Sequence, residues 1–260
     1  MSSPYRQMIL ELGDVGFSYS RQDAFVTKLS FSVGEGEFIG LLGANGSGKS
    51  TILKLCCGIL KPSAGFLNLW DKPFSAYHNK DRAKLISYLP QTLDMNVPFT
   101  VKELVSMGLY PYDILPEMTA DEALGLVGLS DKADSHITEL SGGEKRRTFI
   151  AMTLLQGAGL ILLDEPLANL DIRYQIELVR LLRRLRDERN ISVVMALHDI
   201  NIALRFEKVM LIKNGKVFGM GSPAEALTEG AIKETFGIGV KIMRQPDGKA
   251  YITYEENDNG

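Results

Sequence analysis

The stretch Gly43-Ala44-Asn45-Gly46-Ser47-Gly48-Lys49-Ser50 decides the fold of this chain. The apolar run 37–42 before it is short enough for a buried strand, and the proline-free run 50–60 after it predicts a helix. Glycines let the connecting backbone turn tightly with its N–H groups pointing inward, and the helix N-terminus adds about half a positive charge. The pattern G-x-x-x-x-G-K-[ST] in this setting predicts a loop that binds the phosphates of a nucleoside triphosphate.

Two residues of this loop carry the predicted chemistry. Lys49 would reach the β- and γ-phosphates, and the Ser50 hydroxyl would ligate Mg²⁺. The alternative is a chance glycine-rich turn, which ordinary composition produces in about one chain of this size in a hundred. The flanking strand and helix favour phosphate binding.

The composition is that of a globular protein without a basic surface. The 260 residues are 45% hydrophobic and 23% charged, and the formal net charge is −3. This length fits one large domain or two small ones, and the acidic balance argues against a nucleic-acid partner. We expect neither a secretory signal nor a membrane span, because no run approaches the ~18 apolar residues that a span needs. Any membrane role is therefore expected to come through a partner protein.

Cys56 and Cys57 are neighbours in the predicted helix after the loop. Neighbouring side chains on a helix point about 100° apart, which suits neither a disulfide nor a chelating pair. Two buried thiols in a reducing, cytosolic compartment are the expectation.

Alternating apolar residues predict an antiparallel sheet ahead of the loop. The two series are Val15, Phe17 and Tyr19, and then Leu29, Phe31 and Val33. Tyr19 fits two interpretations, a core aromatic or a ring that stacks on an adenine base.

Hairpins are expected at three places further along the chain. The first has residues 61–65 ahead of a strand at 66–70, the second turns at Asn214-Gly215, and the third turns at Asp247-Gly248. Ser222, Pro223 and Glu225 form a helix-start pattern, and residues 255–260 are expected to be disordered.

The pattern turns helical after residue 97. Thr100 with Glu103, and Thr119 with Glu122, have the spacing of capping boxes that begin helices. A small helical subdomain inserted into an α/β body is expected here.

A second candidate anion site begins at Ser141, which precedes Gly142 and Gly143 at the start of a helical run over 145–156. Two free N–H groups, a hydroxyl and the helix dipole suit an anion. An ordinary N-cap, with Ser141 as the capping residue, explains the same pattern.

Two predicted strands end in residues that suit triphosphate chemistry. The continuous apolar run 160–163 predicts a strand buried on both faces of a parallel sheet, ending at Asp164 and Glu165. Ligands of such sheets bind at the carboxyl ends of strands, so Asp164 suits the Mg²⁺ shell and Glu165 could orient or deprotonate the attacking water. A solvated acidic turn is the alternative. The run 191–197 predicts another strand, and His198 at its end either touches the γ-phosphate or is structural.

Two other features carry less information. Residues 86–89 predict a strand that ends before Gln91, and a lone glutamine there has little meaning by itself. The arginine-rich run 172–186 has apolar residues at helical spacing, so its arginines are interpreted as a solvated helix face and not as a nucleic-acid site.

Taken together, these motifs resemble the ATP-binding subunit of ABC transporters over nearly the whole chain. By this resemblance the Walker A loop is 43–50, Walker B is 160–164, the catalytic glutamate is Glu165, the Q-loop holds Gln91, the signature is 140–144, the D-loop is Asn169-Leu170-Asp171, the H-loop holds His198 and the A-loop aromatic is Tyr19. The resemblance implies ATP contacts from Tyr19, Gly43, Ala44, Asn45, Gly46, Ser47, Gly48, Lys49, Ser50 and Thr51, and Mg²⁺ contacts from Ser50, Gln91 and Asp164. It implies catalytic roles for Glu165, His198 and Gln91, and contacts to the ATP of a second subunit from Ser141, Gly142, Gly143 and Glu144, with Asp171 in the D-loop.

The fold that the resemblance implies is an α/β P-loop NTPase core with a mostly parallel sheet, an N-terminal antiparallel β-subdomain and an inserted helical subdomain. The expected division of one ABC ATPase domain is 1–96 and 157–222 for the core, 97–156 for the helical subdomain, and 223–260 for C-terminal helices and a hairpin.

The resemblance also implies a mechanism and partners. Two copies pair head to tail as a homodimer, so each ATP lies between the Walker A loop of one copy and the signature of the other. Gln91 would link the nucleotide to an integral membrane permease docked near residues 92–116, with a substrate-binding protein as an indirect partner and no nucleic acid. The expected location is the cytoplasmic face of the cell membrane, held through the permease.

Two motifs depart from the common family pattern, and the identity of the cargo stays open. The signature has Glu144 where glutamine is frequent, and the D-loop begins Ala168-Asn169, which leaves open how tightly the subunits close. The segments 107–111, 198–205 and 234–237 most resemble importers of iron–siderophore, haem or cobalamin chelates. The alternatives are an importer or exporter of another cargo, a soluble ABC-type ATPase without transport, and a small-molecule kinase, which would leave Ser141 and His198 without a role.

Overall fold

A computed structural model describes residues 7–20, 24–93, 98–245 and 250–254. The strands are β1 (Met8–Phe17), β2 (Val26–Gly34), β3 (Phe38–Leu42), β4 (Ala64–Leu69), β5 (Lys72–Pro73), β6 (Ile86–Leu89), β7 (Leu160–Leu163), β8 (Ser192–Leu197), β9 (Lys208–Lys213), β10 (Lys216–Gly221), β11 (Val240–Arg244) and β12 (Ala250–Tyr254). The α-helices are α1 (Lys49–Cys56), α2 (Asn79–Leu85), α3 (Val101–Ser106), α4 (Ala120–Leu126), α5 (Gly142–Leu155), α6 (Ile172–Arg189), α7 (Ile200–Ala203), α8 (Pro223–Ala226) and α9 (Glu229–Phe236). Short 3-10 turns lie at Phe74–Ala76, Met107–Leu109, Ser130–Lys132 and Ile137–Glu139.

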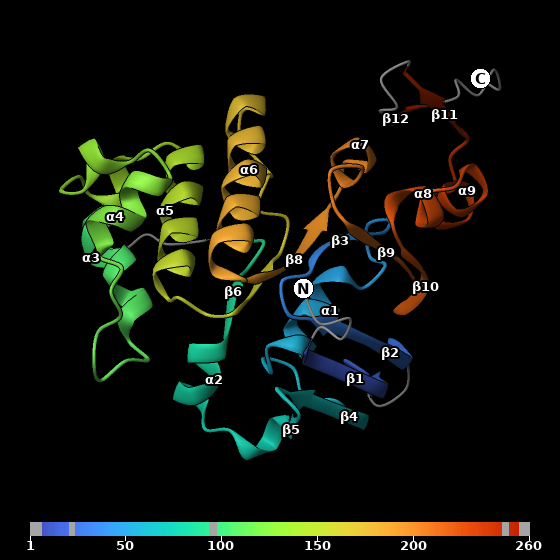
Figure 1. Ribbon diagram of the computed structural model, residues 1–260, viewed down its shortest axis with the longest axis horizontal. Helices are drawn as coiled ribbons and strands as arrows, with labels where there is room; N and C mark the ends of the chain where they lie inside the picture. The colour runs from blue at the N-terminus through green and yellow to red at the C-terminus, as the bar shows by residue number, and fades with distance from the viewer. Residues whose placement is uncertain (1–6, 21–23, 94–97, 246–249, 255–260) are drawn as a thin grey trace, which may run out of the picture.

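A six-stranded sheet with the order β10-β9-β3-β8-β7-β6 forms the centre of the molecule (Figure 1). The five consecutive strands β9, β3, β8, β7 and β6 run parallel to one another, and only the edge pair β9–β10 is antiparallel. The carboxyl ends of β3, β7 and β8 therefore meet at one edge, which is where the phosphate loop, Asp164 and His198 begin. The predicted α/β fold with a mostly parallel sheet is confirmed.

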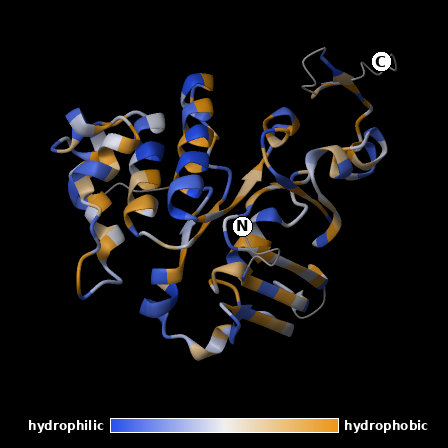
Figure 2. Cartoon of the chain, in the orientation of Figure 1, coloured by the Kyte–Doolittle hydropathy of each residue, from blue (hydrophilic) through white to orange (hydrophobic). Residues whose placement is uncertain are grey.

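Both faces of this sheet are covered. On β3, Phe38 and Leu42 join one apolar cluster, with the helical segment and α6, whereas Ile39 and Leu41 join a second cluster, with α1 and the antiparallel sheet. β8 divides its side chains in the same alternating way and is hydrophobic along most of its length in Figure 2. Continuous apolar runs are what strands buried on two faces require.

The second sheet is antiparallel, with the order β2-β1-β4-β5, as the alternating N-terminal pattern predicted. Two details differ from the prediction. The first hairpin turns at Trp70 and Asp71, which both have positive φ, while 61–65 leads from the first helix into β4. Tyr19 lies beyond the end of β1 and is 63% exposed, because register shifts interrupt the alternation after Leu12 and again after Val15. The core interpretation of this ring is therefore wrong.

Helices α3, α4 and α5 gather at one side of the sheet, at the left of Figure 1. The capping boxes predicted at Thr100 and Thr119 are present, and the N3 glutamate of each accepts a hydrogen bond from the backbone N–H of the cap. The described part of the segment 97–156 has no strand, although its division from the core as a subdomain stays a prediction. None of the described helices is long and apolar enough to cross a membrane.

Helix α6 crosses between this helical segment and the sheet. Leu178, Leu182 and Leu185 are buried, and Figure 2 shows one hydrophobic and one hydrophilic side of the helix. Ile172, the first member of the predicted apolar series, is 75% exposed because it begins the helix outside the packed region.

The C-terminal part continues the sheet and then leaves it. Asn214 and Gly215 both have positive φ and join β9 to β10 in the predicted hairpin. The capped start of α8 at Ser222 is present, and β11 pairs antiparallel with β12. The predicted turn at Asp247-Gly248 and the predicted disorder over 255–260 lie outside the described residues.

Candidate nucleotide-binding site

The glycines of the loop between β3 and α1 adopt conformations that other residues avoid. Gly46 has φ 77° and Gly48, the N-cap of α1, has φ 108°. A Cβ atom on Gly43 would lie 2.4 Å from the carbonyl oxygen of Ile212, because the loop passes close to β9. These restraints fix a turn with inward N–H groups at the positive end of α1.

Lys49 is buried inside this turn with its ammonium group held by the loop itself. Its Nζ donates to the carbonyl oxygens of Gly43 at 2.8 Å and Ala44 at 3.3 Å. Burial lowers the pKa of Lys49, and the charges of Glu165 and Asp164 oppose this shift. A buried cation bound only to neutral carbonyls is suited to an anionic ligand in front of it.

Ser50 and Asp164 bring two oxygen ligands together. The Ser50 hydroxyl donates to Oδ1 of Asp164 at 3.0 Å, and the Tyr88 hydroxyl donates to Oδ2 at 3.2 Å. Asp164 is 1% exposed, and burial raises its pKa. A desolvated carboxylate beside a hydroxyl fits Mg²⁺, which uses one or two carboxylates together with substrate phosphates. The described residues offer no cluster of three or more His, Cys, Asp or Glu, so phosphates and water would complete such a shell.

Glu165 joins the Q-loop and H-loop residues. Its Oε2 accepts from Nε2 of Gln91 at 2.6 Å and lies 2.6 Å from Nε2 of His198. Glu165 is 7% exposed and has φ 52°, an unusual conformation that turns its side chain back toward the phosphate loop. Gln91 and His198, the other two predicted catalytic residues, therefore both contact one carboxylate oxygen of Glu165.

Tyr19 stands next to the phosphate loop from the antiparallel sheet. Its hydroxyl is 2.8 Å from Oγ1 of Thr51, on the first turn of α1. The ring packs edge-on against Phe17 and Phe25, with ring centroids 4.8 Å and 5.5 Å away. An exposed ring held in this way offers a face for an adenine base.

These elements enclose a pocket of about 320 Å³. Its lining residues are Phe25, Asn45, Gly46, Ser47, Gly48, Lys49, Ser50, Thr51, Gln91, Glu165 and His198. The signature residues 141–144 and Asp171 do not line it, so one copy of the chain assembles only part of the predicted site.

Ser141 is the N-cap of α5 and forms a capping box with Glu144. The Ser141 N–H and hydroxyl donate to Oε2 of Glu144 at 2.9 Å and 2.7 Å, and the Glu144 N–H donates to the hydroxyl at 3.3 Å. These hydrogen bonds lower the pKa of Glu144. Because glutamate and glutamine both serve at the third position of a capping box, this departure from the common signature preserves the helix start.

Arg146 is a contributor that the sequence analysis missed. It is 6% exposed and donates to five backbone carbonyls, those of Pro90, Gln91, Asp164, Glu165 and Pro166. The bonds to Gln91 at 2.7 Å and Glu165 at 2.6 Å are the shortest. Nothing in the sequence separates Arg146 from the other cations of its helix, since its partners lie 18 to 56 positions away.

The two neighbouring cysteines lie at the C-terminal end of α1. Cys56 ends α1 and is buried, and Cys57 is half-buried. Burial raises the pKa of both thiols, to about 11 for Cys57. Neither belongs to the site.

A strand, a glycine-rich loop and a helix that cradle a lysine, with a buried aspartate at the end of a neighbouring strand, define a P-loop nucleoside triphosphatase. Comparison with known proteins narrows this class. The family model of the ABC transporter matches residues 26–168, and the chain belongs to this family. It is an ATP-binding subunit with ATPase activity.

Individual relatives and structures agree with this assignment. The chain is 37% identical over 245 residues to the iron(3+)-hydroxamate import ATP-binding protein of Bacillus subtilis, with 91% of each chain covered. It is 35% identical to the hemin import ATP-binding protein of Bordetella avium over 85% of this chain and 89% of that one. Among solved structures, one described as a metal-chelate type ABC transporter in an inward-facing conformation has a TM-score of 0.80 at 25% identity, with 96% and 98% covered. A dimeric ATP-binding cassette bound to ADP and Pi has a TM-score of 0.75 at 26% identity, with 83% and 99% covered.

Proposed function

We propose that this chain hydrolyses ATP as a head-to-tail homodimer that energises the import of a metal chelate of the iron–siderophore, haem or cobalamin type. The observation that carries the cargo class is the set of relatives, which are import ATP-binding proteins for iron(3+)-hydroxamate, hemin and petrobactin. No residue of the nucleotide site contacts cargo, so the cargo class rests on this similarity.

The head-to-tail pairing is supported by the incomplete site. Lys49, Glu165 and His198 line the phosphate pocket, whereas Ser141 stands exposed at the start of another helix. That helix start has two glycines and a dipole that favour an anion. A second copy, turned head to tail, would supply this start to the γ-phosphate and exclude water from it.

Within this dimer each residue of the site has a separate role in binding or hydrolysing ATP. Lys49 and the loop N–H groups hold the β- and γ-phosphates, and Tyr19 holds the adenine. Mg²⁺, when bound by Ser50 and Asp164, neutralises charge on the phosphate oxygens. Glu165 orients the attacking water and accepts its proton, after its carboxylate exchanges the hydrogen bond from Gln91 for one from water. His198 then faces the γ-phosphate.

The coupling to a permease is supported by an exposed apolar surface beyond the Q-loop. Met107, Tyr110, Ile114 and Leu115 are large hydrophobic residues with 40%, 78%, 88% and 67% of their surface exposed. Such a group is typical of a protein–protein contact. Because Gln91 precedes this segment and bonds Glu165, movement of the carboxylate on hydrolysis would reach the permease contact.

The experiment that tests this function is membrane co-purification from cells with and without the cognate permease genes. The chain is expected in the membrane fraction only when the permease is present, at the cytoplasmic face. An Ile114→Asp/Leu115→Asp variant should stay in the soluble fraction, while its ATP binding is retained. Recovery of the wild-type protein in the soluble fraction of both strains would favour a soluble ATPase without transport.

A further inference from the structure

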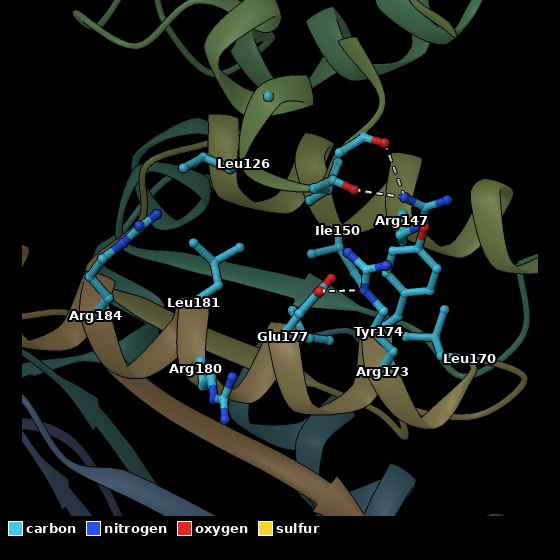
Figure 3. A pocket seen from close by; sticks show the side chains of 14 residues that line it. Leu126, Arg147, Ile150, Leu170, Arg173, Tyr174, Glu177, Arg180, Leu181 and Arg184 are labelled. Atoms are coloured by element: carbon cyan, nitrogen blue, oxygen red, sulfur yellow. Dashed lines mark hydrogen bonds and ion pairs between the residues drawn. The ribbon is translucent and has the colours of Figure 1, made fainter. Parts of the chain in front are cut away.

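A second pocket is lined by none of the nucleotide-site residues. It has a volume of about 480 Å³ and opens between the end of α4, the middle of α5 and the stretch of α6 from Arg173 to Arg184 (Figure 3). We refer to it as the α5–α6 pocket, and its lining includes Leu126, Arg147, Tyr174, Leu181 and three arginines of α6. A cavity of this size holds a small organic molecule.

The charges around the α5–α6 pocket are strongly unbalanced. Arg147, Arg173, Arg180 and Arg184 line it with a single carboxylate, that of Glu177, which leaves a net charge of +3. The whole chain has a net charge of −3, so this concentration of cations is not a property of its composition. Such a surface attracts anions.

Two of these arginines have no partner among the described residues. Glu177 is engaged by Arg173 at 2.8 Å, and no hydrogen bond or ion pair involves Arg180 or Arg184. Figure 3 shows the Arg184 side chain rising from α6 beside Leu181 toward Leu126, whereas the Arg180 side chain leaves the helix on another side. An anion in the pocket would therefore give Arg184 a partner.

The opposite end of the pocket is preorganised by Arg147. Its guanidinium stacks on the Tyr174 ring at 4.0 Å and donates to the carbonyls of Val127 and Gly128 at 2.9 Å and 3.1 Å. Its Nε is buried without a hydrogen-bond partner. Figure 3 shows Leu181 and Arg184 rising from α6 toward Leu126, so an apolar surface separates this end from the unpaired cations.

We propose that the α5–α6 pocket binds a small organic anion, with an apolar body between Leu126 and Leu181 and a carboxylate, sulfonate or phosphate group at Arg184. The apolar part is desolvated against the leucines while the charged group pairs with the Arg184 guanidinium. Such a ligand bridges α4 to α6.

The test uses the full chain at about 0.15 M salt, where long-range surface attraction is screened. The probe is 8-anilinonaphthalene-1-sulfonate, an aromatic body with one anionic group, titrated by fluorescence. The uncharged comparison probe is N-phenyl-1-naphthylamine. Wild-type protein is expected to bind the sulfonate saturably, and Arg184→Gln to weaken its affinity at least fivefold while changing that of the uncharged probe less than twofold.

Two further variants make the result specific. Lys216→Gln makes the same change in net charge at an exposed position outside the pocket, and it should leave both affinities within twofold of wild type. Leu181→Gln should weaken both probes, because it removes apolar surface that each of them covers. Thermal unfolding checks that all variants are folded. Sulfonate binding that the arginine variant leaves unchanged, or an equal loss for both probes, would overturn the proposal.

Discussion

Truncation of Arg146 should slow ATP hydrolysis although Arg146 lies outside the nucleotide pocket. Its guanidinium connects the backbone at Gln91, where the Q-loop begins, to the backbone at Glu165, after Walker B. It does not line the phosphate pocket. Arg146→Ala is therefore expected to lower kcat for ATP hydrolysis while KM for ATP changes little, because it loosens the positions of Gln91 and Glu165.

The size of the effect follows from the hydrogen bonds. A hydrogen bond from a charged donor contributes about 1.5–3 kcal/mol, so the two shortest of the five give about 3–6 kcal/mol. This is a large part of the about 5–15 kcal/mol by which a domain is stable. Arg146→Lys keeps the charge, but its three N–H donors sit on one nitrogen instead of a planar fork, so it cannot reach both backbone segments. We expect it to recover less than half of the lost stability.

The assay is urea unfolding of each variant, followed by steady-state ATPase kinetics. Lys145→Ala is the matched control, since it removes the neighbouring cation of α5, whose side chain has no ion pair or hydrogen bond with the part of the chain that the structure describes. The Lys variant keeps the test usable if Arg146→Ala does not fold. An Arg146→Ala protein within about 1 kcal/mol of wild type, or one that loses affinity for ATP at unchanged kcat, would refute the positioning role.

Three further predictions concern the nucleotide. Glu165→Gln should bind ATP normally but turn over about 10²–10³-fold more slowly, measured by phosphate release, and near-normal turnover would exclude Glu165 from the chemistry. The same variant should dimerise on ATP in size-exclusion chromatography with light scattering, and adding Ser141→Arg should abolish the dimer; an equally strong dimer would contradict the composite site. Tyr19→Ala should weaken ATP binding by about 1–3 kcal/mol in calorimetry, whereas Tyr19→Phe, which loses only the Thr51 contact, should stay close to wild type.

Local pattern was enough to predict the elements that carry the phosphate site. The glycine spacing of 43–48 could be interpreted from sequence because each glycine is required locally, either by a positive φ or by a close approach of the backbone. Buried parallel strands are readable because both of their faces are apolar, and their ends then place Asp164 and His198 at one edge. The capping boxes of α3 and α4 are readable because their partners are three residues apart.

Features that depend on distant partners could not be predicted in this way. Arg146 looks like any other helix cation until the fold brings five carbonyls to it. Tyr19 continues the alternation of Val15 and Phe17, but bulges in β1 end the strand and leave the ring exposed beside the phosphate loop. Ile172 has the right spacing for the core, but whether the first turn of α6 is covered depends on packing.

Ser141 shows why two interpretations of one pattern need not exclude each other. In the single chain its hydroxyl donates to Glu144 and caps α5, so the cap interpretation is correct as it stands. A γ-phosphate brought by a second copy would offer the same hydroxyl another anionic acceptor, and the helix start would remain formed, because Glu144 still accepts the Ser141 N–H. Closing the proposed dimer then exchanges one charged acceptor for another, which keeps the net change in hydrogen-bond energy small. In the proposed dimer the carboxylate of Glu144 would stay close to the incoming phosphate, so its charge would oppose closure where a glutamine would not.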